Sequence, residues 1–347
     1  MSRIAVVTST PPFSEGGHLV IARSLVRALR EHGHQADLIT TPSNRFGRQA
    51  SAYLANWMTD VGRTGAGEPV DQVITLRYPS YAVRHERHVC WLNHTMREYY
   101  DRWDEFSARL SPQGRFKEGL RRTAIHAVDT YLFKHHVTKL FTISKTVSAR
   151  LLKWNSVSSE VLYPPAPQRD YRCESYGDFI FVYSRLSRLK RIGLVIEALA
   201  TPAAAGVRCV IAGDGEQRDA LVARIRELGL GDRVSLVGHV TDDELTRYLA
   251  SCRAVCFVPS DEDFGMVTVE AFASGKAVVT ATDSGAPVEL VAPGVNGDVV
   301  APEPAALGVA LATLSADAAL AERLGQAAAR GAAEITWTNA IARLVLR

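Results

Sequence analysis

Short apolar runs rich in β-branched residues alternate along this chain with longer segments of helical periodicity. In the first half the runs lie at 3–9, 35–40, 72–76, 88–92, 139–143 and 160–163. In the second half they lie at 179–183, 207–212, 233–237, 254–258 and 277–280. Helical periodicity marks segments such as 17–32, 190–201, 216–229 and 303–314. This strand–helix alternation predicts parallel sheets that helices cover on both faces.

The length of the chain and its two strand series predict an α/β protein with two doubly wound, Rossmann-like domains. At 347 residues the chain is too long for one core of common size. Prolines and polar residues in YPPAPQRDYRCESYGD, at 163–178, separate two apolar runs and predict a linker near 164–177. The expected domains are 1–165 and 178–330. The terminal segment 331–347 is expected to hold a short helix that Thr336 or Thr338 caps, packed back toward the first domain.

The charge distribution along the chain is uneven. Residues 1–169 hold 23 Lys and Arg against 14 Asp and Glu, although the whole chain has a net charge of +3. A basic first half predicts an anionic partner or a membrane surface, and the alternative is an ordinary solvated surface. No nucleic-acid partner is expected. The chain lacks an apolar run of about 18 residues, and its five cysteines are scattered. We therefore expect a cytoplasmic protein with reduced thiols and peripheral contact at the inner membrane face.

Several motifs follow predicted strands, where parallel sheets bind ligands, and two facing domains would place the site in a cleft between them. Gly16 and Gly17 open the first helix and would let an anion approach the backbone. In YSRLSRLKRIG, Arg185 and Lys190 suit a diphosphate. In VSLVGHV, the backbone of Gly238, His239 and Val240 would read a base edge. Each motif has a plain alternative: a packing glycine, a solvated basic surface or an ordinary turn. The loop AGDGEQ at 212–217 is predicted to be structural.

The stretch DEDFGMVTVE at 261–270 is the most informative. Gly265 is expected to start a helix whose first N–H groups point outward, which suits phosphate or sugar oxygens. Glu270 would lie in the second turn among apolar residues, where a carboxylate needs a partner, and a ribose diol is a suitable one. Glu262 would accept hydrogen bonds from sugar hydroxyls. His94 follows the strand at 88–92 at its cleft end, although a lone histidine is more often structural.

Together these residues resemble the retaining family 4 glycosyltransferases (glycosyl transferases group 1) of GT-B architecture. The resemblance rests on PPFSEGGHLVIARSLVRALREHGHQADLIT, FTISKTVSARL, YSRLSRLKRIGLVIEAL, EDFGMVTVE and TDSGAPVELVAPGVNGDVV, in that order. It implies catalytic roles for His94, Arg185, Lys190 and Glu262. It implies donor contacts from Gly16, Gly17, Gly238, His239, Val240, Phe264, Gly265, Met266, Val267 and Glu270. The chain departs from the family's Gly-Gly-x-x-Glu where it has Gly285-Ala286-Pro287-Val288-Glu289.

The resemblance implies transfer of a hexosyl unit from GDP-mannose or a UDP-hexose to a hydroxyl acceptor, either a lipid-linked glycan or a small natural product. Retention of configuration is expected through attack on the face from which the diphosphate leaves, because no carboxylate is placed as a nucleophile. No metal or other cofactor is expected, since no Asp-x-Asp pair is placed to hold a metal on a diphosphate. The alternative is a nucleotide-sugar-binding protein or an epimerase of the same fold without transfer activity.

Overall fold

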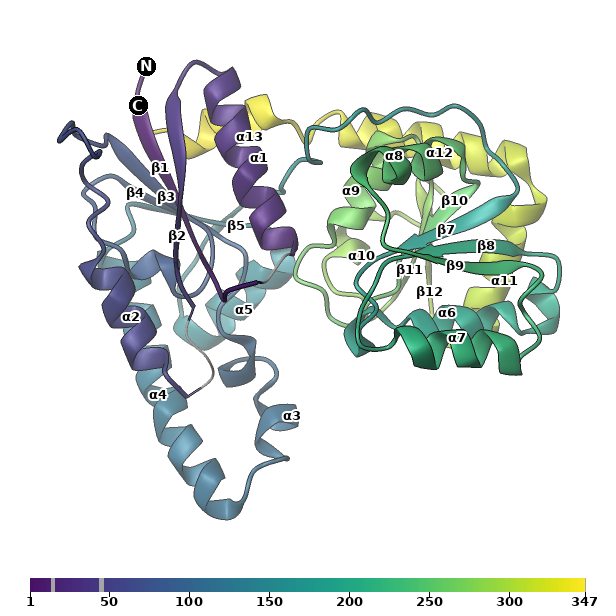
Figure 1. Cartoon of the computed structure of the whole chain (residues 1–347), viewed down its shortest axis with the longest axis horizontal. Coiled ribbons are helices and arrows are strands. Elements are labelled where there is room, and N and C mark those ends of the chain that lie inside the picture. The colour runs from purple at the N-terminus through teal and green to yellow at the C-terminus, as the bar shows by residue number, and fades with distance from the viewer. Residues whose placement is uncertain (14–15, 44–46, 347) are drawn as a thin grey trace. The chain divides into compact units, whose positions relative to one another are not determined.

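The computed structural model describes residues 1–13, 16–43 and 47–346. The chain forms two compact units, Met1–Pro164 with Trp337–Arg347, and Pro165–Thr336. Each unit has a six-stranded parallel sheet with helices packed on it (Figure 1). The predicted α/β class with two doubly wound sheets is confirmed.

The first unit contains the strands β1 (Arg3–Thr10), β2 (Gln35–Pro42), β3 (Gln72–Thr75), β4 (His88–Leu92), β5 (Lys139–Thr142) and β6 (Glu160–Val161). Their order in the sheet is β2-β1-β3-β4-β5-β6. Every residue of β4 is buried, as expected for a central parallel strand that is covered on both faces. The helices are α1 (Gly17–Glu31), α2 (Gln49–Met58), α3 (Trp103–Ser107), α4 (Pro112–His135), α5 (Lys145–Asn155) and α13 (Trp337–Leu344).

Helix α13 attaches the end of the chain to the first unit. The Gln72 amide donates to the carbonyl of Leu344 at 2.7 Å and accepts from the N–H of Leu346 at 2.8 Å. Ile341 and Leu344 are buried, as the apolar face predicted. Two details differ from the sequence analysis. Residues 331–336 belong to the second unit, and Thr338 lies inside α13, where its hydroxyl lies 3.1 Å from Nε2 of His32.

The second unit contains β7 (Phe179–Tyr183), β8 (Arg208–Ala212), β9 (Val234–Gly238), β10 (Ala254–Cys256), β11 (Val278–Ala281) and β12 (Gly297–Val300). Their order in the sheet is β12-β11-β10-β7-β8-β9. The helices are α6 (Ile192–Leu199), α7 (Arg218–Glu227), α8 (Asp242–Ser251), α9 (Met266–Ala273), α10 (Pro287–Leu290), α11 (Pro304–Ala316) and α12 (Ala318–Ala332).

Alternate residues of β7 point to opposite faces of this sheet. Ile180 and Val182 pack with α6 and α7, whereas Phe181 and Tyr183 pack with α8 and α9 (Figure 1). The unit begins at Pro165 rather than at 178, because the stretch expected to be a linker is bonded to it. One such bond runs from the Tyr176 hydroxyl to the Gly275 carbonyl at 2.9 Å.

Within the described part of the chain, no single helix is long and apolar enough to cross a membrane. One pair, Pro304–Ala316 with Ala318–Leu344, has the length and composition only when joined, and it is bent by 100°.

Candidate functional site

The loop between β10 and α9 is fixed by backbone contacts with the loop after β11. The N–H of Glu262 donates to the Ser284 carbonyl at 2.9 Å, and the Glu262 carbonyl accepts from the N–H of Ala286 at 3.0 Å. Gly285, between them, has φ +76°, and a Cβ there would lie 2.5 Å from the Glu262 carbonyl oxygen. Only glycine fits this position, so the glycine loop that the sequence singled out holds Glu262 in place.

Lys190 and Glu262 meet in the second unit, although 72 residues separate them. The Lys190 Nζ lies 2.5 Å from Oε2 of Glu262 and 5.3 Å from the centre of the Phe257 ring. Both side chains are only about one-fifth exposed, at 22% and 23%. The turn that carries Lys190 is held against the β10 loop, because the N–H of Ser260 donates to the Leu189 carbonyl at 2.8 Å. A cation for phosphate oxygens and an acceptor for hydroxyls thus lie side by side.

The other basic residues of this turn have different surroundings. Arg185, predicted as the partner of Lys190, is exposed. Arg191, which was not singled out, binds the Val258 carbonyl at 2.7 Å and both carboxylate oxygens of Asp283 at 2.7 Å. The hydrogen bonds and charge of Arg191 lower the pKa of Asp283. Arg191 therefore holds the loops after β10 and β11 together, which is a structural role.

The amino end of α9 is shaped by Gly265, which has φ +79°. A Cβ there would lie 2.7 Å from Cε1 of Phe257 and 2.9 Å from Cγ of Pro287. Within the described chain no side chain caps this helix, and its first turn contains no acidic residue. Phe264 and Val267 are buried and Met266 is partly exposed. The helix thus begins where predicted, and its amino end carries the partial positive charge of a helix dipole.

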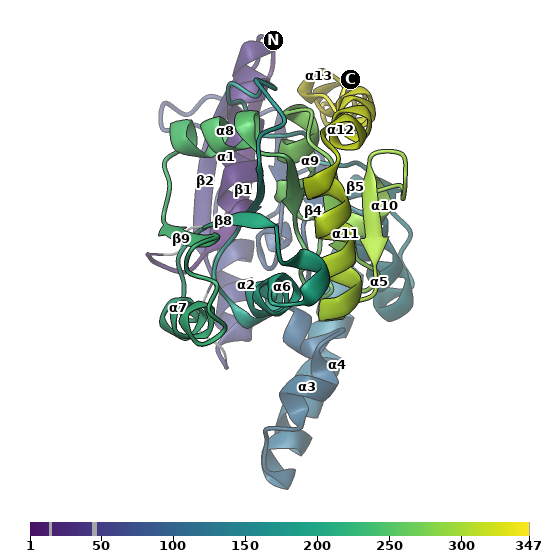
Figure 2. The ribbon, with the colours of Figure 1, turned by 90° about the vertical axis from the view of Figure 1, so that its right-hand side faces the viewer.

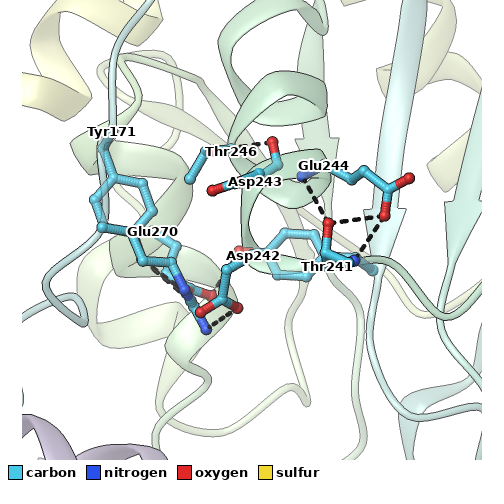
Figure 3. Close-up of polar contacts among 9 residues, drawn as sticks. Tyr171, Thr241, Asp242, Asp243, Glu244, Thr246 and Glu270 are labelled. Carbon is cyan, nitrogen blue, oxygen red and sulfur yellow. Dashed lines mark hydrogen bonds and ion pairs between the residues drawn. The ribbon is translucent and has the colours of Figure 1, made fainter.

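Glu270 is buried on α9, with 3% of its surface exposed, and protein side chains bind its carboxylate. Its Oε1 accepts the Tyr171 hydroxyl at 2.8 Å and forms an ion pair with Arg169 (Figure 3). Its Oε2 accepts the Tyr183 hydroxyl at 2.8 Å. Burial raises the pKa of Glu270, and the Arg169 guanidinium and the two phenols oppose this increase.

The carboxylate therefore has the partners that its apolar surroundings require. Those partners are Arg169, Tyr171 and Tyr183 rather than a ribose alone, and the sequence analysis missed all three. Arg169 and Tyr171 lie in the stretch expected to be a linker, where an arginine and an aromatic residue among prolines were the available signal. The ribose role of Glu270 stays a prediction.

The carboxyl end of β9 leads to a residue that contacts Arg169, the ion-pair partner of Glu270. Gly238 has φ +81° with open space around its Cβ position, His239 is exposed, and Val240 packs on the α8 side of the sheet. Thr241 and Glu244 then form a capping box that starts α8 (Figure 3). The first residue of α8, Asp242, binds Nη2 of Arg169 at 2.8 Å. Arg169 therefore connects the predicted base-reading segment with Glu270.

The loop AGDGEQ packs against the chain that follows β7. A Cβ on Gly213 would lie 1.9 Å from the Ser184 carbonyl oxygen, and one on Gly215 would lie 2.5 Å from that of Leu186. These glycines allow two backbone segments to touch, which is the structural role expected for the loop.

The remaining predicted residues belong to the first unit. Gly16 precedes α1, its carbonyl accepts the N–H of Leu19 at 3.0 Å, and Gly17 is the first residue of the helix. His94 follows β4, and its Nδ1 lies 2.6 Å from the Thr95 carbonyl oxygen. It lines a cavity of about 10 Å³ with residues that include Arg97 and Arg150. Glu15, which precedes the two glycines in the sequence, lies outside the described residues.

Residues 172–331 match the family model described as glycosyl transferases group 1. This match covers most of the second unit, Pro165–Thr336. D-inositol 3-phosphate glycosyltransferase of Mycolicibacterium smegmatis is 36% identical to the chain over 121 residues, which are 33% of this chain and 27% of that protein. The lipopolysaccharide core biosynthesis mannosyltransferase LpcC of Rhizobium leguminosarum bv. viciae is 41% identical over 118 residues, 32% of this chain and 31% of that one. The match thus spans about a third of these curated relatives.

Solved structures resemble the chain over nearly its full length. HepE of Anabaena, in complex with UDP and glucose, has a TM-score of 0.68 at 20% identity and covers 98% of each chain. WaaG, a glycosyltransferase involved in lipopolysaccharide biosynthesis, has a TM-score of 0.71 at 16% identity and covers 98% of this chain and 99% of that one. The group 1 unit and its companion unit therefore have the GT-B fold.

Proposed function

We propose that this chain is a retaining glycosyltransferase of family 4 that moves a hexosyl unit from a nucleotide-diphosphate sugar to a hydroxyl acceptor. One observation carries the proposal: the Lys190 ammonium lies 2.5 Å from the Glu262 carboxylate, on a loop that leads into the uncapped amino end of α9. The comparisons support it, because the relatives are named as sugar transferases and HepE was solved with UDP and with UDP-glucose. GDP-mannose and UDP-hexoses are the candidate donors.

The proposed chemistry uses both members of the Lys190–Glu262 pair. Cleavage of a sugar–phosphate bond leaves positive charge on the sugar and negative charge on the diphosphate. Lys190, with Arg185 and the first N–H groups of α9, stabilises the leaving diphosphate, as electrostatic catalysis requires. Glu262 exchanges Lys190 for a sugar hydroxyl, so each partner of the ion pair gains a new partner from the donor.

In the proposed transfer step, the acceptor hydroxyl oxygen bonds to the anomeric carbon as the bond to the diphosphate oxygen breaks. The hydroxyl proton passes to the leaving diphosphate on the same face of the sugar, and the configuration is retained. His94 is proposed, from the family resemblance, as a contact of the donor sugar. We propose that the positive charge that stabilises the leaving diphosphate comes from these protein groups and not from a metal ion.

A donor panel tests this proposal. Thermal shifts with UDP, GDP and ADP, measured with a chelator present, should single out one nucleotide, and the matching sugar nucleotides are then assayed for transfer. Lys190→Ala should lower kcat more than it raises KM, since negative charge grows on the diphosphate in the transition state. Arg188→Ala, an exposed cation on the same turn, is the matched control and should change neither. Nucleotide binding without turnover of any sugar nucleotide would contradict transferase activity and favour the alternative of a nucleotide-sugar-binding protein.

For the acceptor, we propose a lipid-linked glycan reached at an anionic membrane surface. Helix α4 and α3 extend beyond the sheet of the first unit in both views (Figure 1, Figure 2). Large apolar side chains at helical spacing are exposed along α4 by 72%, 61%, 40% and 54%: Phe116, Leu120, Val128 and Tyr131. The cations Arg115 and Lys117 are exposed beside them. Exposed apolar residues among cations suit an anionic lipid surface.

A groove of about 460 Å³ lies alongside this helix, lined by residues that include Arg48, Tyr53, Arg121 and Val128.

Vesicle sedimentation tests the membrane contact. Binding should require anionic lipid, fall with salt, and weaken in Phe116→Ser with Leu120→Ser. Leu152→Ser is the matched control, because Leu152 is 59% exposed on α5. Equal binding to neutral vesicles, or an equal loss in the control, would contradict the proposal.

A further inference from the structure

We infer that Arg169 and Tyr171 are positioning residues of the nucleotide site, and that the Tyr171 hydroxyl occupies a position on Glu270 that a ribose hydroxyl takes when the donor binds. This inference rests on the proposed function and deepens it. It follows from the contacts around one buried carboxylate, all of which lie within the second unit.

The number of acceptor positions on Glu270 is the first step. A carboxylate offers about four lone-pair positions on its two oxygens. Three described side chains use three of them, because Oε1 accepts from both Arg169 and Tyr171 and Oε2 accepts from Tyr183. A vicinal diol donates two hydrogen bonds and needs two positions. One protein donor must therefore yield its position to the diol.

The surroundings of the three donors indicate which one yields. Tyr183 lies on the central strand β7, only 8% exposed, and its ring stacks on Phe181 with ring centres 5.2 Å apart. Arg169 is held at its far side by Asp242 at 2.8 Å. Tyr171 is partly exposed and lies outside any helix or strand. Its hydroxyl donates to Glu270, and its oxygen also lies 3.3 Å from Nη1 of Arg169. Tyr171 is therefore the donor that can move at the smallest cost.

Arg169 has a different role, because it sets the charge of Glu270. Burial favours the neutral acid, and Arg169 is the strongest group that opposes this effect, while Asp242 raises the pKa of Glu270 slightly. The described charged groups and phenols around the carboxylate are Arg169 and Tyr171 from the stretch before β7, Tyr183 from β7 and Asp242 from α8. An ionised Glu270 accepts both hydroxyls of a diol, whereas the neutral acid is a poorer acceptor.

Calorimetric titration with UDP and with GDP tests the inference on the full chain. Tyr171→Phe removes the competing hydroxyl and should tighten the nucleotide that binds by about fivefold, the worth of one net hydrogen bond. The same diphosphate without its two ribose hydroxyls should bind the variant and the unaltered chain equally. Tyr176→Phe is the matched control, because Tyr176 lies on the same segment and its hydroxyl binds Gly275 instead. It should leave the affinity unchanged.

Arg169→Gln gives a second, independent measurement. Without the guanidinium, the pKa of Glu270 should rise, so nucleotide affinity should increase with pH more steeply in the variant than in the unaltered chain. A role confined to packing would weaken binding equally at every pH. Unaltered or weaker nucleotide affinity in Tyr171→Phe, in a chain that binds nucleotide, would overturn this inference alone. Failure of the unaltered chain to bind UDP or GDP would overturn the inference together with the ribose role of Glu270 in the proposed function.

Discussion

Gly265→Ala is expected to destabilise the second unit by two separate effects that the structure distinguishes. At φ +79°, a residue with a Cβ occupies the left-handed region at a cost of roughly 1–2 kcal/mol. The new Cβ would also lie 2.7 Å from Cε1 of Phe257 and 2.9 Å from Cγ of Pro287. Both neighbours belong to packed segments, so relieving the overlap should cost about 1–3 kcal/mol more. The expected loss in free energy of unfolding is about 2–5 kcal/mol.

Gly229→Ala separates these effects. Gly229 follows α7 with φ +66°, and nothing lies within 4 Å of its Cβ position. Alanine there should cost only the conformational term, about 1–2 kcal/mol. The difference between the two variants is therefore the cost of the overlap at the amino end of α9.

Urea denaturation followed by far-UV circular dichroism measures both variants. The five tryptophans, at 57, 91, 103, 154 and 337, all lie in the first unit, so their emission shows whether the two units unfold together. If Gly265→Ala and Gly229→Ala lose the same stability, the overlap with Phe257 and Pro287 is not real and the reasoning fails. A large loss for Gly229→Ala alone would equally refute it.

Two further predictions concern pH. Asp129 is fully buried and accepts hydrogen bonds from Tyr53, Tyr81 and Tyr100, and burial raises its pKa from 3.8 to about 6. Its folded pKa is raised, so stability should fall by about 3 kcal/mol as pH rises from below 3.8 through 6, and Asp129→Asn should flatten that slope in urea titrations. The pKa of Asp283 is lowered by Arg191, which gives the opposite sign. Because Asp283 is 48% exposed, Asp283→Asn should cost less than about 1 kcal/mol at neutral pH and nothing in acid, and a loss that persists in acid would exclude the ion pair as its cause.

The strands could be predicted because a buried parallel strand is a short run of apolar residues between polar turns. All eleven predicted runs contain a strand. The exception is β12, whose sequence Gly-Asp-Val-Val contains two residues that disfavour strands. It exists because it pairs with β11 along its whole length, from Val278 opposite Gly297 to Ala281 opposite Val300. Pairing of this kind depends on tertiary contacts and leaves no local pattern.

The parts of the site that could be predicted are those that depend on position along one segment. Gly265 was expected at the start of a helix, because a strand–loop–helix junction requires glycine where the backbone turns sharply. Lys190 and Glu262 lie together because both follow strands of one parallel sheet, whose carboxyl ends share an edge. Arg191 was missed, since a run of basic residues gives no sign of which one reaches the carbonyls of Val258 and Pro259.

Glu270 shows how far local reasoning extends. Its apolar neighbours on α9 require a partner for the carboxylate, and this requirement is visible in the sequence. Its partners are not, because Arg169 lies 101 residues away and Tyr183 lies 87 residues away. Removing one partner of a buried ion pair leaves an unpaired charge and is strongly destabilising. A ligand that binds this carboxylate must therefore supply donors as it displaces others, which a diol can do and a single hydroxyl cannot do as well. The contacts with Arg169, Tyr171 and Tyr183 thus require a ligand to replace the hydrogen bonds that it displaces. For the same reason they select a diol over a single hydroxyl.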